Sequence, residues 1–295
     1  MHSWTSAPPG SPGGDQPVSK INDHRVALRA LGASGASGAS GASGASGASG
    51  AAGGSGGSGE HSEHSEHSEH SGLDRLDNWL SYLSTHSGLP GPRGNLELVA
   101  ACGEEADVAM ADNLVATGDE FATVCGAVAL GRCLGGGDRT HLDVLHRLAG
   151  DDRWRVREGA AMALQRAGDD DLGACFAVAE LWAGDPDPLV RRAAVAAVCE
   201  PRLLRDVVFA RRALTVLDEI TAGLAATPAA QRRDPSVRTL RQALGYGWSV
   251  VVAADPADGL PVFERLETSS DPDVSWIVRE NHKKARLRRV LAAPS

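Results

Sequence analysis

The chain has 295 residues, enough for one or two domains of ordinary size, and a formal net charge of -9. Aromatic residues make up only 4% of it, which disfavours a fold built from β-strands. No run of about 18 apolar residues and no charged-then-apolar leader occurs, so we expect no membrane crossing. Five cysteines with no CxxC pair predict buried free thiols in a reducing compartment, which favours the cytoplasm.

Residues 1–72 differ from the rest in composition. Gly-Ala-Ser triplets run over 32–49, and Glu-His-Ser triplets run over 60–71. Such sequence buries too little apolar surface to offset the entropy of ordering the chain. The sequence therefore predicts a disordered low-complexity tail over residues 1–72. Within it, Ile21, Leu28 and Leu31 lie on one side of a helix too short to be stable alone, and docking of this helix on the folded part is an alternative.

The Glu-His-Ser run places four imidazoles close together. Because imidazole binds zinc, nickel and copper, His61, His64, His67 and His70 are candidate metal ligands. Nothing in a flexible tail holds these side chains in a fixed geometry, so an inert linker is the favoured interpretation. The histidines of the folded part form no HExxH motif. We therefore expect no metal site and no cofactor.

Apolar residues recur with a helical period from Leu73 onward. The first predicted helix ends at the Gly-Leu-Pro-Gly-Pro segment 88–92, and the next runs from the capping residue Asn95 to about Ala116, with an interruption at Gly103 as an alternative. Further helices are predicted at 119–134, 139–149, 153–167, 170–183, 187–199, 202–226, 235–253, 257–268 and 273–291. Residues 73–295 are therefore expected to form an all-α domain.

One local pattern recurs before four of these helices. Asp-Asp-Arg-Trp-Arg-Val-Arg begins at residue 151, Asp-Pro-Asp-Pro-Leu-Val-Arg at 185, and shorter copies begin at 234 and 271. An Asp before a helix accepts hydrogen bonds from its first free N–H groups, and Pro fits in the first turn. The valines of the four copies, Val156, Val190, Val237 and Val274, are 34, 47 and 37 residues apart, the spacing of a helix-pair repeat.

This pattern resembles the Asp-Pro-x-Val-Arg-x-x-Ala-x-x-x-Leu form of bacterial HEAT repeats, and the segment from residue 271 is similar to actinobacterial HEAT proteins. The resemblance implies an armadillo-type fold, a right-handed α-solenoid of about five to six HEAT-type helix pairs over residues 73–295. It also implies a ladder of side chains between adjacent repeats, formed by Asp152, Arg157, Asp187, Arg191, Asp234 and Arg238. The fourth copy has Ser275 in place of the Arg.

Charge is distributed unevenly along the chain. Residues 1–72 hold three Lys/Arg against six Asp/Glu, and residues 274–295 hold six against one, which leaves -11 on residues 73–273. A solvated terminal face is the favoured interpretation of the basic end of the last predicted helix, and contact with an acidic protein or with nucleic-acid phosphate is the alternative. The candidate contact residues are Trp276, Arg279, Lys283, Lys284 and Arg286.

No reactive constellation accompanies the four repeat starts. The leading hypothesis is a non-enzymatic scaffold that binds another protein on the concave surface of the solenoid. The alternative is a DNA-binding or DNA-repair module that uses the basic C-terminal helix. A HEAT-like DNA glycosylase using Trp154 and Asp152 is disfavoured, because the surrounding span is acidic and the Asp is explained as a helix cap.

Overall fold

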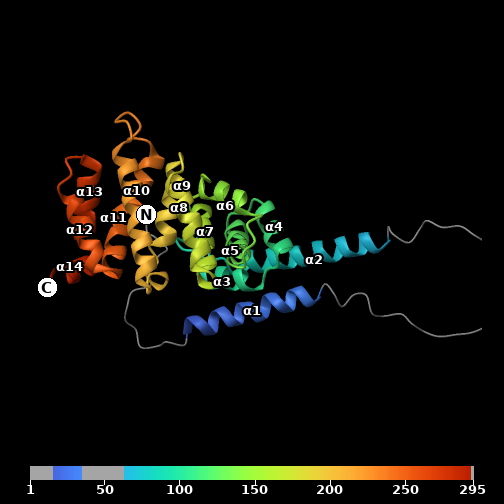
Figure 1. Ribbon diagram of the computed structural model, residues 1–295. Helices are drawn as coiled ribbons and strands as arrows, with labels where there is room; N and C mark the ends of the chain where they lie inside the picture. Colours follow the sequence, from blue (N-terminus) through green and yellow to red (C-terminus); the bar gives the residue numbers. More distant parts are fainter. Residues whose placement is uncertain (1–15, 35–62, 294–295) are drawn as a thin grey trace, which may run out of the picture. The chain divides into compact units, whose positions relative to one another are not determined.

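The computed structural model describes residues 16–34 and 63–293, and all regular secondary structure in these ranges is helical, as predicted. The described helices divide into two compact units. One contains helices α1 to α3 and ends at Glu105, and the other begins at Ala106 and contains helices α4 to α14 (Figure 1). The predicted domain 73–295 therefore includes part of the first unit and the described part of the second.

The first unit consists of α1 (Gln16–Ser34), α2 (Glu63–His86) and α3 (Leu96–Glu105). Helix α1 packs mainly on α3 and also on α2. Its Leu28 is fully buried, and Arg25 donates a hydrogen bond of 2.6 Å from Nε to Glu105 at the end of α3.

Residues 16–34 and 63–72 are thus helical, which corrects the prediction of disorder for those residues. The physical reason is tertiary: α3 and α2 supply the apolar surface and the carboxylate that a short isolated helix lacks. The docking alternative describes α1 correctly. The rest of the predicted tail, residues 1–15 and 35–62, lies outside the described residues.

The helices of the second unit follow one another in chain order, from green to red in Figure 1. They are α4 (Val108–Ala116), α5 (Glu120–Gly135), α6 (Leu142–Ala149), α7 (Trp154–Asp170), α8 (Leu172–Ala183), α9 (Pro188–Val198), a 3-10 turn (Pro201–Leu203), α10 (Val207–Ala225), α11 (Pro235–Ala254), α12 (Pro256–Glu267), α13 (Pro272–His282) and α14 (Ala285–Leu291). The bounds of α5 to α12 lie close to those predicted. The predicted helix 273–291 is instead two helices, because Lys284 has an extended backbone, with φ -81° and ψ 126°.

Five helices of the second unit form a layer in which each packs on the next: α5, α7, α9, α11 and α13. Helices α8, α10 and α12 pack on one another in a second series. All four repeat starts open helices of the first layer, which we call the motif layer. The motif valines are all buried, and Asp187, Asp234 and Asp271 cap their helices as predicted; Asp187, for example, accepts a hydrogen bond of 2.8 Å from the N–H of Leu189. At α7 the prediction is wrong, because Arg153 occupies the cap position and no side chain caps that helix.

Small residues let the motif-layer helices approach closely. A Cβ atom added to Gly131 of α5 would lie 2.2 Å from the main-chain oxygen of Ala163 of α7, so only glycine fits at this crossing. Ala160 and Ala194, one turn after their motif valines, are fully buried. The core of the motif layer therefore has no space for larger side chains at these crossings.

We expect Ala194→Glu to lower the free energy of unfolding by about 3 kcal/mol or more, because it buries an unpaired charge in this layer. The matched control is Ala222→Glu, since Ala222 is exposed on α10. Thermal melts of the full chain, followed by circular dichroism, measure both. An Ala194→Glu variant that melts with the wild type would show that this face is not packed.

Candidate interaction surface

The six residues predicted to form a ladder lie at the helix starts, where their hydrogen bonds stay within one repeat. Arg157 donates from Nη1 to the main-chain oxygens of Asp151 and Asp152, at 2.5 and 2.8 Å. Asp187 and Asp234 cap their own helices. Among the residues that the structure describes, no hydrogen bond or ion pair joins an acid of this set to an arginine of an adjacent repeat.

The fourth repeat start shows what the arginine position of the motif does. Ser275 stands there, and its hydroxyl donates to the main-chain oxygen of Ser269 in the preceding loop, at 3.2 Å. This is the same kind of bond that Arg157 makes to its own preceding loop. In these two copies the position therefore ties the helix start to the loop before it.

Ion pairs between successive motif helices come from other side chains. Arg155 of α7 bonds Glu120 of α5 at 3.2 Å, and Arg192 of α9 bonds Glu158 of α7. Arg241 of α11 bonds Asp273 of α13. The Glu158 side chain is only 6% exposed and that of Arg192 16%, so water screens this pair little and its geometry matters for packing.

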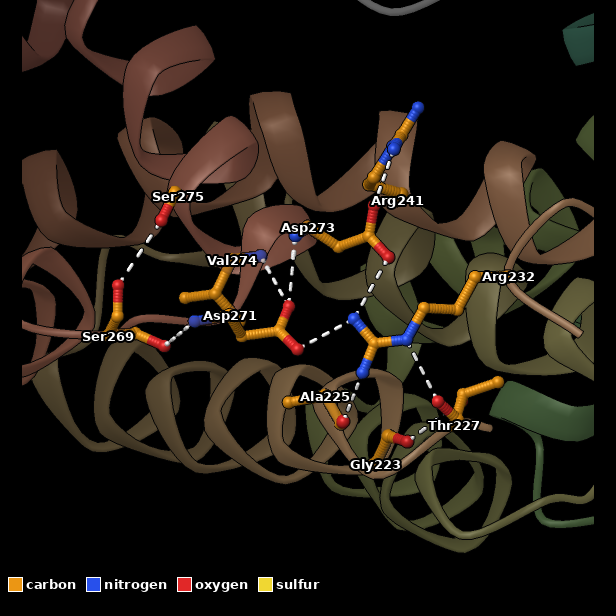
Figure 2. Close-up of polar contacts among 10 residues, drawn as sticks. All are labelled: Gly223, Ala225, Thr227, Arg232, Arg241, Ser269, Asp271, Asp273, Val274 and Ser275. Atoms are coloured by element: carbon orange, nitrogen blue, oxygen red, sulfur yellow. Dashed lines mark hydrogen bonds and ion pairs between the residues drawn. The ribbon is translucent and has the colours of Figure 1, made fainter. Parts of the chain in front are cut away.

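A second network centres on Arg232, in the loop between α10 and α11 (Figure 2). Its guanidinium donates to the main-chain oxygens of Ala225 and Thr227, at 2.5 and 2.9 Å. Its Nη1 also lies 2.6 Å from a carboxylate oxygen of Asp271, which caps α13, and 3.3 Å from Asp273. One side chain thus joins the end of α10, the loop and the start of α13. The repeat motif does not indicate this residue, because Arg232 lies outside the four copies of the pattern.

The charge state of Asp271 reflects this contact. Burial raises the pKa of its carboxyl, but hydrogen bonds from Arg232 and from the main-chain N–H groups of Val274 and Asp273 outweigh burial and hold the pKa below its ordinary value. The hydrogen bond to Asp271 in turn raises the pKa of Arg232. The pair is therefore fully ionised at neutral pH.

The predicted partner contacts are largely engaged with the protein itself. The Arg241 guanidinium lies 4.6 Å from the centre of the Trp276 ring. Arg286 donates to the Tyr246 hydroxyl at 2.6 Å, and the Lys284 ammonium lies 5.7 Å from the centre of the Tyr246 ring. Lys283 pairs with Glu280 at 2.5 Å.

Three arginines at this end remain available. Arg279, Arg288 and Arg289 are exposed. No hydrogen bond or ion pair joins their side chains to any other residue in the ranges 16–34 and 63–293. We call Arg279, Arg288 and Arg289 the exposed basic cluster.

The candidate metal ligands lie outside the described side chains. His61 is outside the described residues, and His64, His67 and His70 belong to the part of α2 of which only the backbone is described. Where the structure describes side chains, no group of three or more His, Cys, Asp or Glu is arranged to hold a metal ion. All five cysteines are free and four are buried, which confirms the free-thiol prediction; burial raises the pKa of Cys175 to about 12.

The packing of α5 to α9 coincides with a family match. Residues 115–199 match the family described as HEAT repeats. The chain contains HEAT repeats. No curated protein and no solved structure is similar enough to the chain to match it. HEAT repeats generally mediate contacts between proteins and typically form non-enzymatic scaffolds.

None of the described helices combines the length and apolar character that crossing a membrane requires.

We expect Arg232→Ala to lower the free energy of unfolding by about 2–4 kcal/mol, because it leaves two carbonyls and two carboxylates without their donor. The control is Arg233→Ala, an adjacent exposed arginine. Chemical denaturation at pH 7 compares the two variants with the wild type. Equal losses would show that the Arg232 network contributes no more than a surface residue.

The same comparison has a pH dependence with a defined sign. Because the folded-state pKa of Asp271 is depressed, its ion-pair contribution is present above the unfolded pKa and is lost as the pH falls below about 4. The difference between the wild type and Arg232→Ala should therefore be similar at pH 7 and pH 5 and shrink below pH 4.

Proposed function

We propose that this protein is a non-enzymatic scaffold that holds another protein on the concave surface of its HEAT-repeat stack. The observation that carries the proposal is the motif layer, in which repeat starts of one pattern open successive helices and residues 115–199 match HEAT repeats. Stacked repeats of this kind present an extended surface whose usual ligand is a peptide or a protein. The partner is a protein whose identity the chain does not reveal.

The C-terminal end supports a contact with an acidic part of the partner. Residues 274–295 carry six Lys/Arg and one Glu, whereas the preceding span is acidic. Trp276, Lys284 and Arg286 have their side chains fixed by Arg241 and Tyr246. A contact made by pre-positioned side chains loses little conformational entropy on binding. The exposed basic cluster adds charge that no internal carboxylate neutralises.

Binding of DNA or RNA phosphate is the competing function for the same end. Phosphate binding needs many cations on one face, because each contact contributes through release of counterions. Here the cluster is small, and the preceding span carries a large negative charge that repels a polyanion. These observations favour the protein partner.

Affinity capture from the native host tests the proposal with the full chain as bait. The test variant changes Arg279, Arg288 and Arg289 to Glu together. The control changes Arg139, Arg147 and Arg205 to Glu, since these arginines are also exposed and the net charge changes equally. We expect mass spectrometry to identify a protein retained by the wild type and the control and lost by the test variant. A partner retained equally by all three would exclude the C-terminal end as its contact.

A fluorescence-anisotropy titration near physiological salt, with a short DNA duplex and a single strand, tests the competing function. We expect only feeble binding that is unchanged in the Arg279/Arg288/Arg289 variant. Submicromolar binding that falls steeply with salt and disappears in that variant would replace the protein scaffold with a nucleic-acid module.

A further inference from the structure

Helix α1 is held on α2 and α3 by a polar contact that depends on one histidine. Nδ1 of His24 lies 2.8 Å from the hydroxyl of Tyr82 on α2. Its Nε2 lies 3.3 Å from Nδ2 of Asn95, the residue that precedes α3. This contact joins α1 to both of the helices on which it packs.

The protonation state of His24 follows from the orientation of Asn95. Oδ1 of Asn95 accepts a hydrogen bond of 3.0 Å from the N–H of Leu98, which caps α3, and Nδ2 donates to the main-chain oxygen of His86 at 3.0 Å. The cap therefore directs the amide NH₂ group toward His24. Because Nδ2 can only donate, Nε2 of His24 must accept, and the proton of the neutral ring sits on Nδ1 and is donated to Tyr82.

A second proton on His24 has no acceptor in this arrangement. It would place an Nε2–H group against the NH₂ group of Asn95. The charged groups nearby have mixed effects: burial first, and then His86 of α2, lower the pKa of His24, whereas Glu97 of α3 and Asp23 of α1 raise it. The net direction is downward, in agreement with the geometry. The His24 and His86 ring centres are 6.0 Å apart.

We infer that residues 16–34 are a dissociable ligand of the α2–α3 surface within the same chain, held tightly while His24 is neutral and less tightly when His24 is protonated. The segment is suited to this role. It docks through one side, where Leu28 is buried, while Val18 and Val26 are 60% and 64% exposed. It is joined to α2 through the Gly-rich residues 35–62, a tether that keeps its effective concentration high.

The other polar contacts of α1 do not titrate in the same range. Arg25 and Arg29 bind Glu105. Burial raises the pKa of Glu105, but its hydrogen bonds to Arg29 and Arg25 bring the pKa below the ordinary value, so this carboxylate stays ionised at pH 5.5. A change in docking between pH 7.5 and 5.5 is therefore not assigned to these contacts, which leaves His24 and its neighbour His86 to be separated by substitution.

The sign and size of the effect follow from linkage. The docked pKa of His24 lies below the ordinary value of about 6.5, so docking is fully favourable above that pH and weakens as the pH falls. The docking constant falls by at most about tenfold for each pH unit until the docked pKa is reached. Between pH 7.5 and 5.5 the expected decrease is therefore up to about tenfold.

Hydrogen exchange of the full chain, read by mass spectrometry and corrected for intrinsic exchange rates, measures the docking constant as the protection of residues 16–34. We expect this protection to fall by up to about tenfold from pH 7.5 to 5.5, while α7 and α9 keep theirs. His24→Gln removes the titrating group, so its protection should not change with pH. His86→Gln is the matched control and should retain the fall.

A second variant keeps the test decisive if His24→Gln abolishes docking. Asn95→Asp preserves an N-cap but turns an acceptor toward Nε2, which favours the protonated ring. Its α1 protection should be higher at pH 5.5 than at pH 7.5, opposite to the wild type. Equal protection at both pH values in the wild type, or a wild-type fall that persists in His24→Gln, would overturn the inference.

Discussion

The close approach of helices in the motif layer is the constraint on which the HEAT-repeat unit depends. At the crossing of α5 and α7, Gly131 leaves no space for a side chain next to Ala163, and Ala160 and Ala194 fill the same role along the layer. Small side chains bury little apolar area each. Stability must therefore come from many helices in contact, and a repeat in isolation could not hold its own structure.

Close stacking also brings helix ends and loops together, and arginine satisfies their carbonyl groups. Arg153, just before α7, donates to the main-chain oxygen of Gly118 at 2.6 Å, and Arg232 does the same for the last residue of α10. The last carbonyls of a helix have no partner within it and carry partial negative charge. A planar cation with five donors can bind such an oxygen and a nearby carboxylate together, which a lysine does less well.

Local chemistry made the helix starts of this chain predictable. Contacts between residues distant in sequence could not be predicted in the same way. An aspartate followed by proline determines where α9, α11 and α13 begin, whatever the rest of the fold does. The break between α13 and α14 and the docking of α1 depend on residues distant in sequence; Arg25 and Glu105, for example, are 80 positions apart. The periodicity of apolar residues within one segment does not indicate which distant residue that segment will contact.

The ion pairs between repeats could not be predicted from the sequence either. Arg155 stands one position before its motif valine, Arg192 two after, and Arg241 four after. The position that faces the next helix depends on how each helix is rotated about its own axis relative to its neighbour. Repeats that differ in length by more than a helical turn do not share one such rotation. The motif therefore identified the layer but not the residues that connect it.

Asp273 links this packing to the basic end of the chain. Its carboxylate accepts from both Arg232 and Arg241, and Arg241 in turn lies over Trp276. This buried acid thereby joins Arg241, which it binds directly, to the Arg232 network, in which Asp271 is the nearer carboxylate. The same arrangement leaves the exposed basic cluster as the part of this end whose charge no bond to another described residue neutralises.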